Sequence, residues 1–171
     1  MSSVLRVTVV CSGNICRSPI GEVVLRDAVE RAGLGDSVVV DSAGIGAWHV
    51  GDGADPRAVA VLAAHGYDGS THEVQQITRA WFTEATDARP APDLLLAMDV
   101  GHHDALRRLA PDTDVRMYRS FDPTPAGSSI DGTDLDVPDP YYGKLSDFDE
   151  VLALIKVATP GVVAHLRSLL T

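Results

Sequence analysis

The sequence predicts an α/β fold in a single domain, residues 1–171, with a four-stranded parallel sheet and helices on both faces. Short runs that are apolar throughout alternate with longer segments in which apolar residues recur at helical spacing, as in βαβ units. The first apolar run leads straight into a polar loop and then a helix, and crossovers of this kind are right-handed and join parallel strands. The length suits one core, and no linker interrupts the chain.

The strands and helices are expected in alternating order. Runs of apolar and β-branched residues predict strands at 4–10, 38–40, 94–98 and 115–118. Helical spacing predicts helices from 19 to the glycines at 33 and 35, then at 56–65, 78–82, 101–109 and 146–170. Ligands of such sheets bind beyond the carboxyl ends of the strands, which is where the first loop would lie.

Polar residues and prolines predict how the helices begin and end. Ser18-Pro19 and Asp55-Pro56 each suit an N-cap followed by proline at the first helical position. Ser146 suits the N-cap of the last helix, with acidic residues in its first turn. Thr159-Pro160-Gly161 interrupts that helix, so we expect a kink or a second helix there.

The composition is that of an acidic globular protein. The formal net charge is −10 and the sequence pI is about 4.8, which argues against nucleic acid as a partner because a basic surface is missing. No stretch approaches the roughly 18 apolar residues of a membrane span, and no basic leader with a cleavage site is present, so we expect no membrane partner. Two cysteines suit a reducing cytoplasm.

The most informative stretch is the loop at residues 11–19, with the sequence CSGNICRSP. A loop between a strand and a helix N-terminus binds anions, because free backbone N–H groups meet the positive end of the helix dipole there. Cys11 opens the loop with a nucleophile that reacts as the thiolate, and Arg17 closes it with a planar fork of donors. Gly13 and Asn14 tolerate a positive φ, so the loop is predicted to cradle a phosphate beside a covalent nucleophile.

Cys11 and Cys16 also leave two other interpretations open. Their spacing could be half of a metal site, but the chain has no further cysteine and no suitably spaced histidine pair. His102-His103 is adjacent, so on a helix the two rings point to different faces. A structural disulfide would suit a secreted protein, and nothing marks this chain as one. We therefore expect no metal and no cofactor.

Two later stretches have the composition of ligand sites but the wrong spacing. Gly44-x-Gly46 is followed by His49 where a dinucleotide-binding loop needs its third glycine, so we interpret this stretch as a wall of the cleft. The acidic loop at 123–136 lacks the spacing of a calcium-binding loop, and we assign no function to it. The aspartate that precedes this loop and those within it are interpreted as solvated loop charges: Asp122, Asp131, Asp134 and Asp136.

Residues 11–19 resemble the signature of the low-molecular-weight protein tyrosine phosphatases, which is Cys-x5-Arg-Ser/Thr with Gly-Asn-x-Cys inside and proline after it. The late segment Asp139-Pro140-Tyr141-Tyr142-Gly143 is similar to the second signature of that family. The resemblance runs from about Leu5 to the C-terminus. It implies a bacterial-type member with a Rossmann-like fold of the phosphotyrosine protein phosphatase I type.

The resemblance implies a protein-tyrosine phosphatase, a phosphoric monoester hydrolase that works through a phosphocysteine. Cys11 would be the nucleophile, Arg17 would bind the phosphate, and Asp139 would be the general acid and then the base. Trp48, Tyr141 and Tyr142 would form a deep slot suited to phosphotyrosine. The other expected substrate-binding residues belong to the loop itself: Ser12, Gly13, Asn14, Ile15, Cys16 and Ser18.

The resemblance also implies support for the loop and a set of partners. His72 matches a family histidine that props the loop through Asn14, and Ser18 would support it from the helix. The expected partners are phosphotyrosine-containing proteins or peptides, with inorganic phosphate as product and inhibitor. We expect a cytoplasmic monomer; some bacterial relatives are exported without a signal peptide, which the sequence leaves open.

Three competing functions differ from this expectation at particular residues. Relatives that reduce arsenate relay a disulfide through two further downstream cysteines, and this chain has none after Cys16. Relatives that act on phosphoarginine carry threonine where this chain has Ile15. A phosphate-binding module without activity would not need Cys11, Arg17 and Asp139 together.

Overall fold

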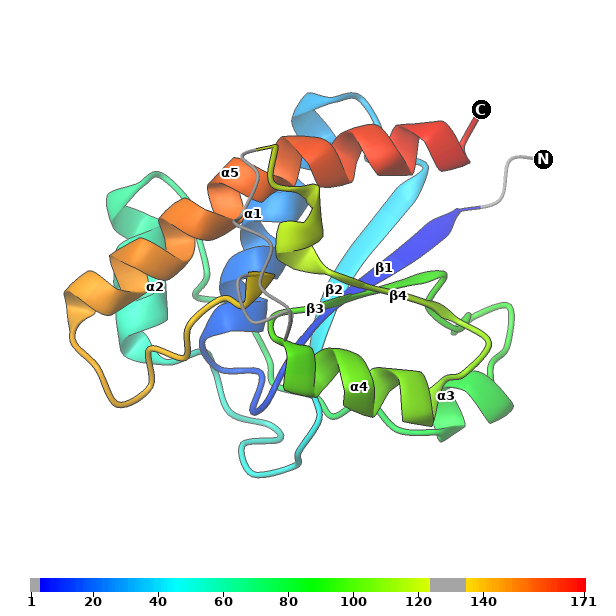
Figure 1. Ribbon diagram of the computed structural model, residues 1–171, viewed down its shortest axis with the longest axis horizontal. Coiled ribbons are helices and arrows are strands. Elements are labelled where there is room, and N and C mark those ends of the chain that lie inside the picture. Colours follow the sequence, from blue (N-terminus) through cyan, green and yellow to red (C-terminus); the bar gives the residue numbers. More distant parts are fainter. Residues whose placement is uncertain (1–3, 124–134) are drawn as a thin grey trace.

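The computed structural model describes residues 4–123 and 135–171 as an α/β fold (Figure 1). Asp131 and Asp134, with most of the acidic loop, lie outside the described residues. The elements in chain order are β1 (Leu5–Cys11), α1 (Arg17–Arg31), β2 (Val38–Gly44), α2 (Pro56–Ala64), α3 (Ala80–Thr83), β3 (Leu94–Ala97), α4 (Val100–Leu109), β4 (Asp114–Met117), the 3₁₀ helix η1 (Tyr118–Phe121) and α5 (Leu145–Leu169).

The four strands form one parallel sheet in the order β2-β1-β3-β4, and the predicted fold class is confirmed. Cys11 at the end of β1 pairs with Gly44 at the end of β2, and Val10 pairs with Ala97 at the end of β3. Because the strands are parallel, these three carboxyl ends meet at one edge of the sheet.

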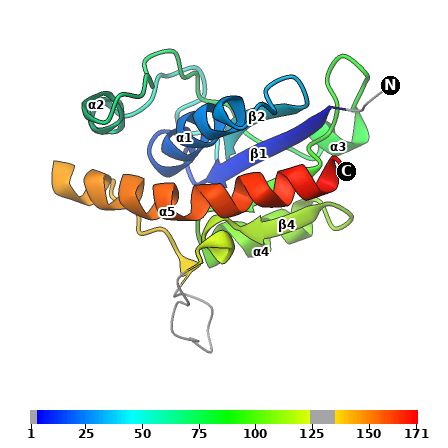
Figure 2. The same cartoon turned by 90° about the horizontal axis from the view of Figure 1, so that it is seen from above.

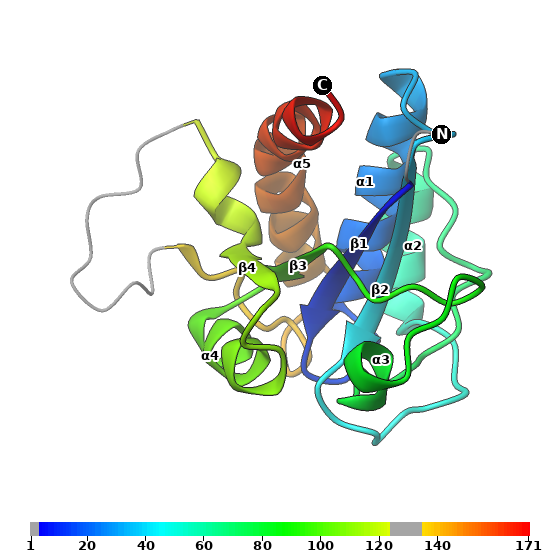
Figure 3. The same cartoon turned by 90° about the vertical axis from the view of Figure 1, so that its right-hand side faces the viewer.

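Helices cover both faces of the sheet, with α1, α2 and α5 on one side and α3 and α4 on the other (Figure 3). Val7 and Val9 of β1 belong to the core under α1 and α5, while Val10 belongs to the core under α4. Successive strand residues face opposite sides of a sheet. A strand buried on both faces is therefore apolar along its whole length, as β1 and β3 are.

The last helix, α5, runs without a break through Pro160, so of the predicted kink or second helix the second helix is excluded (Figure 2). Pro160 is exposed, and water can satisfy the carbonyl that its missing N–H would have bonded. The preceding residue, Thr159, is buried and donates to Ile155 O at 2.6 Å while it bonds the Tyr118 hydroxyl at 2.6 Å. Packing on the core keeps the helix continuous at the proline.

The start of α5 also differs from the prediction. Lys144, not Ser146, is the N-cap, and its backbone N–H donates to Asp147 Oδ2 at 2.7 Å. By length and composition alone α5 could cross a membrane, with a mean hydropathy of 1.3 over its most apolar window. One side of the helix is nevertheless buried in the core, which accounts for its apolar composition.

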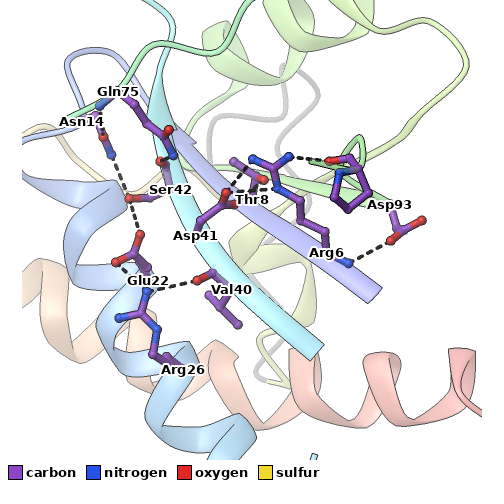
Figure 4. Close-up of polar contacts among 11 residues, drawn as sticks. Arg6, Thr8, Asn14, Glu22, Arg26, Val40, Asp41, Ser42, Gln75 and Asp93 are labelled. Atoms are coloured by element: carbon purple, nitrogen blue, oxygen red, sulfur yellow. Dashed lines mark hydrogen bonds and ion pairs between the residues drawn. The ribbon is translucent and has the colours of Figure 1, made fainter. Parts of the chain in front are cut away.

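A buried cation near the amino end of β1 ties several segments together (Figure 4). The Arg6 side chain pairs with Asp41 of β2 at 2.7 Å and donates to Pro90 O, and the Arg6 backbone N–H donates to Asp93 Oδ2 at 2.8 Å. Asp41 explains why β2 extends beyond the predicted 38–40. A charged residue ended the apolar run from which the strand was predicted, but in the fold the Asp41 carboxylate is paired with Arg6.

Candidate active site

The polar loop follows β1 directly and ends at α1, at the edge where the strand ends meet. Helix α1 begins at Arg17 with Cys16 as its N-cap, so the prediction that Ser18 is the N-cap is wrong. Ser18 and Pro19 instead lie inside the first turn. Proline is tolerated there because the first N–H groups of a helix have no intrahelical acceptor.

The backbone of the loop turns at Asn14, which has a φ of 60°; Gly13 has no positive φ, contrary to the prediction. Asparagine is one of the few residues that adopt this left-handed conformation readily. Gly44, at the end of β2, lies directly against the loop. A Cβ at this position would lie 2.9 Å from Ser12 O and 3.1 Å from Asn14 N, so only glycine permits this close approach.

The side chain of Asn14 is fully buried behind the loop and holds its shape (Figure 4). Its Nδ2 donates to Ser18 Oγ at 2.8 Å and to Ser42 Oγ at 2.9 Å, and the Ser42 hydroxyl in turn donates to Glu22 Oε1 at 2.9 Å. Gln75 N donates to Asn14 Oδ1 at 3.1 Å. Neither Asn14 nor Ser18 lines the cleft above the loop, and the Ser18 hydroxyl meets it only through Cys11.

His72 supports the same turn from outside the loop. Its Nε2 donates to Asn14 O at 2.8 Å, so the histidine contacts Asn14 as the resemblance implied. His72 thus holds the backbone of Asn14, while Ser42 and Gln75 hold the side chain of the same residue. Asn14, at the left-handed turn, is therefore held by hydrogen bonds to its backbone carbonyl and to its side-chain amide.

The two cysteines of the loop have different surroundings, and both are free thiols. Cys11 Sγ lies 3.0 Å from Ser18 Oγ. Burial raises the pKa of the Cys16 thiol well above its usual range, and the negative charge of Asp55, whose Oδ2 lies 3.9 Å from Cys16 Sγ, raises it further. Cys16 is therefore a neutral thiol. Of the two cysteines, only Cys11 has the Ser18 hydroxyl next to its sulfur.

Arg17 is 3% exposed and its guanidinium is held from several sides. Its Nη1 donates to Asp99 Oδ2 and to Val137 O, both at 2.9 Å, and its Nη2 lies 3.8 Å from Asp139 Oδ2. Burial alone would raise the pKa of the Asp99 carboxyl. The His102 N–H, the positive charge that His102 carries when it is protonated, and Arg17 outweigh burial and lower the pKa, so Asp99 is an anion beside Arg17.

His102 is a residue of this site that the sequence interpretation missed. It lies in the first turn of α4, where Asp99 is the N-cap, and its Nε2 is hydrogen bonded to Ser12 Oγ at 2.8 Å. Burial lowers the pKa of His102 to about 4; Asp99 opposes this shift and Arg17 adds to it. The signal in the sequence was its position three residues after an N-cap at the end of a strand.

A cleft of about 190 Å³ opens over the loop. Trp48 and Tyr142 are 75% and 94% exposed, so they stand at its rim. The rings of Tyr141 and Tyr142 contact each other edge to face, 4.8 Å apart, and do not stand on opposite sides of a slot. The cleft is lined by Cys11, Ser12, Gly13, Ile15, Cys16, Arg17, Trp48, His49, Asp139, Tyr141 and Tyr142.

His49 is a second lining residue that the sequence interpretation did not include in the site. It follows Trp48, and its ring lies 3.2 Å from where a Cβ on Gly13 would be.

Within residues 4–123 and 135–171, no three histidine, cysteine or acidic side chains are grouped to hold a metal. The polar groups of the cleft are those of a cradle for an anion, with a thiol at its floor and a carboxyl at its mouth.

The fold and the cleft define a class of protein. A parallel α/β sheet presents a Cys-x5-Arg loop at the start of its first crossover helix, and an aspartate from near the end of the chain faces the arginine of that loop. This arrangement is that of the cysteine-dependent phosphatases whose catalytic loop precedes the acid.

Comparisons with known proteins give the family. The sequence profile described as low molecular weight phosphotyrosine protein phosphatase matches residues 6–169. A low molecular weight protein-tyrosine-phosphatase of Streptomyces coelicolor is 51% identical over 166 residues, covering 95% of this chain and 93% of that protein. The chain therefore belongs to the low-molecular-weight phosphotyrosine protein phosphatase family.

Solved structures agree with this assignment. The crystal structure of YfkJ from Bacillus subtilis is similar, with a TM-score of 0.81 and 30% identity over 99% of this chain and 98% of that one. Wzb from Vibrio vulnificus, in complex with benzylphosphonate, has a TM-score of 0.72 and 31% identity over 95% of this chain and 99% of that one.

Proposed function

We propose that this protein is a protein-tyrosine phosphatase that hydrolyses phosphotyrosine in proteins or peptides through a phosphocysteine intermediate. One observation carries the proposal: Cys11, Arg17 and Asp139 line the same cleft, and Arg17, which closes the nucleophile loop, lies 3.8 Å from Asp139. Membership of the family supports it. The benzylphosphonate bound by the Wzb relative, an aromatic ring on a phosphorus oxyanion, supports an aryl substrate.

In the first step, Cys11 Sγ attacks phosphorus, the S–P bond forms, and the bond from phosphorus to the tyrosyl oxygen breaks. The Ser18 hydroxyl is suited to assist. Its oxygen already accepts from Asn14 Nδ2, and its own proton has the Cys11 sulfur 3.0 Å away as a nearer acceptor than Ala43 O at 3.5 Å. This hydrogen bond stabilises the thiolate when it forms and when it is released again.

Arg17 and the backbone N–H groups of the loop bind the equatorial oxygens of the phosphoryl group and stabilise their charge during transfer. Asp99 and Val137 O hold the guanidinium before substrate binds. A donor that is already oriented needs little reorganisation in the transition state. Inorganic phosphate fits the same cradle, so it is both product and inhibitor.

Asp139 gives its proton to the departing tyrosyl oxygen. It then takes a proton from the water that attacks the phosphocysteine, which breaks the S–P bond and releases phosphate and the Cys11 thiolate. Its side chain is 52% exposed at the mouth of the cleft, so water can reach it. Ile15 and Trp48 line the path of the aromatic ring. Two free thiols suit a reducing compartment such as the cytoplasm.

The nucleophile is tested with Cys11→Ser. Turnover of an aryl phosphate should be lost, while vanadate or phosphate binding by calorimetry should persist because the cradle remains. The wild-type enzyme should be trapped as a phosphocysteine by rapid acid quench and mass spectrometry. Activity of Cys11→Ser near that of the wild type, or a label on another residue, would contradict the proposal.

The acid is tested with Asp139→Ala in single-turnover experiments. A tyrosyl leaving group has a pKa of about 10 and needs the proton, so a positioned acid contributes roughly 10²–10⁴-fold. A nitrophenyl leaving group is much less basic. Asp139→Ala should therefore slow phosphotyrosine peptide far more than para-nitrophenyl phosphate; equal slowing would remove Asp139 from this role.

A further inference from the structure

We propose that Arg57 is a positioning residue for Asp139: it clamps the loop at residues 139–143 to the start of α2 and so fixes where the acid stands over the cleft. The inference rests on the proposed function, because it takes Asp139 as the group that protonates the leaving oxygen. Arg57 itself does not line the cleft and has no contact with the reacting atoms.

The guanidinium of Arg57 spans the acid loop. Its Nη2 donates to Tyr141 O at 2.9 Å and its Nη1 donates to Gly143 O at 3.1 Å. The two carbonyls flank Tyr142, so the arginine closes the loop from outside at two points. A lysine, with one ammonium group, cannot reproduce this planar pair of donors.

The clamp is anchored on the other side by Asp55. Arg57 Nε donates to Asp55 Oδ1 at 3.1 Å and Nη2 donates to Asp55 Oδ2 at 2.8 Å. These bonds lower the pKa of the Asp55 carboxyl, whose side chain is 9% exposed, so the anchor is ionised. The Arg57 guanidinium also lies 4.5 Å above the ring of Phe148, in the first turns of α5.

The anchor is in turn tied to the phosphate loop. Asp55 N donates to Ile15 O at 2.8 Å, in the middle of the loop that holds the nucleophile. One chain of hydrogen bonds therefore runs from Ile15 through Asp55 and Arg57 to Tyr141 and Gly143. It sets the acid loop at a fixed place relative to the cradle.

The last link reaches the acid itself. Tyr141 N donates to Asp139 Oδ1 at 3.1 Å, and Gly143 N donates to Pro140 O at 2.9 Å. Arg57 thus holds the carbonyl of Tyr141, and the amide of Tyr141 orients the carboxyl of Asp139. Asp139 is half exposed and lies 3.8 Å from Arg17, so packing alone does not fix it.

Proton transfer depends steeply on such positioning. A general acid must come within about 2.6–3.2 Å of the oxygen that it protonates, and a misplacement of about 1 Å can cost about 10²-fold. Loss of the clamp should therefore slow the step that expels a basic leaving group. It should have little effect where the leaving group departs without a proton.

The test compares Arg57→Gln with the wild type in single-turnover experiments on a phosphotyrosine peptide and on para-nitrophenyl phosphate. We expect the peptide reaction to slow about 10-fold and the nitrophenyl reaction less than about twofold. Arg116→Gln is the matched control, because Arg116 pairs with Asp114 two residues earlier, as Arg57 does with Asp55, but on β4. It should change neither rate. Equal slowing of both substrates by Arg57→Gln would overturn the inference.

A double variant shows whether Arg57 acts through Asp139. In an Asp139→Ala background, Arg57→Gln should slow the peptide reaction by less than about twofold further, because the acid that it positions is gone. A further slowing as large as in the wild type would overturn the inference while leaving the proposed function intact. If Asp139→Ala itself shows no selectivity between the two substrates, the proposed role of Asp139 fails, and the positioning role fails with it.

Arg57→Lys guards against a general loss of folding. It keeps the positive charge near Asp55 but loses the fork, so it should show the same selective slowing with an unfolding temperature close to that of the wild type. The inhibition constant of inorganic phosphate should stay within about twofold in both variants, because the cradle is untouched. Wild-type selectivity in a folded Arg57→Gln and Arg57→Lys would overturn the inference.

Discussion

Asp99 accepts a hydrogen bond from Arg17 at 2.9 Å, so the arginine of the phosphate loop is paired with an anion before substrate arrives. The pair is fixed by topology. Asp99 stands just after β3 as the N-cap of α4, while Arg17 is the first residue of α1 after the neighbouring strand. A bound phosphate must therefore share the guanidinium with a carboxylate that orients it and also repels the ligand.

Asp99→Asn should make inorganic phosphate bind more tightly. Asparagine keeps one oxygen, which can accept from the His102 N–H at the helix N-cap, but it loses the second oxygen, which bonds Arg17, and the negative charge beside the ligand. The difference between a charged and a neutral hydrogen bond is about 1 kcal/mol, so the inhibition constant of phosphate should fall about fivefold. Competitive inhibition of aryl phosphate turnover measures it. A rise in that constant would show that the charge of Asp99 assists binding.

His102 should make the stability of the protein depend on pH between about 6.5 and 4. The pKa of His102 is about 4 in the fold, because burial lowers it against the opposing effect of Asp99, and it is 6.5 in an ordinary environment. As the pH falls through this window, the unfolded chain binds a proton that the folded chain does not, so stability is lost. The loss should approach roughly 3 kcal/mol by pH 4.

His102→Asn should remove this component, so its free energy of unfolding should fall less between pH 6.5 and 4 than that of the wild type. His103→Asn is the matched control, because His103 is adjacent but only partly buried. Urea denaturation at a series of pH values gives the slopes. Parallel slopes for all three proteins would mean that His102 titrates alike in the folded and unfolded states.

Gly44→Ala should damage the phosphate loop. The added Cβ would lie 2.9 Å from Ser12 O, and since that atom is backbone the loop must shift to relieve the contact. We expect a loss of about 1–3 kcal/mol in stability and at least about 10-fold in turnover. Gly53→Ala is the control, because its nearest atom is His72 O at 3.8 Å. An active and fully stable Gly44→Ala would show that the loop tolerates the displacement.

Alkylation should distinguish the two cysteines. The raised pKa of the Cys16 thiol, caused first by burial and then by Asp55, keeps Cys16 protonated and unreactive at neutral pH. One equivalent of iodoacetamide should therefore label Cys11, as fragment mass spectra can show. In Cys11→Ser, labelling should become at least about 10-fold slower. Equal labelling of both sulfurs in the wild type would contradict this assignment.

The features that could be predicted from the sequence are those set by local composition. β1 and β3 are apolar throughout, and Asp55-Pro56 caps α2 as predicted, because these signals lie within a few residues of one another. The loop at residues 11–17, between β1 and α1, could also be predicted, because the residue types that form it stand next to one another in the sequence.

The features that the sequence did not reveal depend on partners far along the chain. Ser18 looks like an N-cap, but Asn14 and Cys11 occupy its hydroxyl, and the cap lies earlier. His102 looked like one of two equivalent histidines until the fold brought α4 beside Ser12. Arg57 bonds carbonyls 84 and 86 residues away, and no local pattern marks such a contact.

The hydrogen bond from Arg17 to Val137 O joins residues 120 positions apart, and this has a consequence for synthesis on the ribosome. The loop with Cys11 and Arg17 is translated early, whereas Val137 and Asp139 follow much later. Helix α5, which packs beside α1, follows later still (Figure 2). A nascent chain therefore carries Cys11, the proposed nucleophile, before it has Asp139, the proposed acid, and we expect its ability to remove phosphate to arise only when residues 137–169 have emerged and docked.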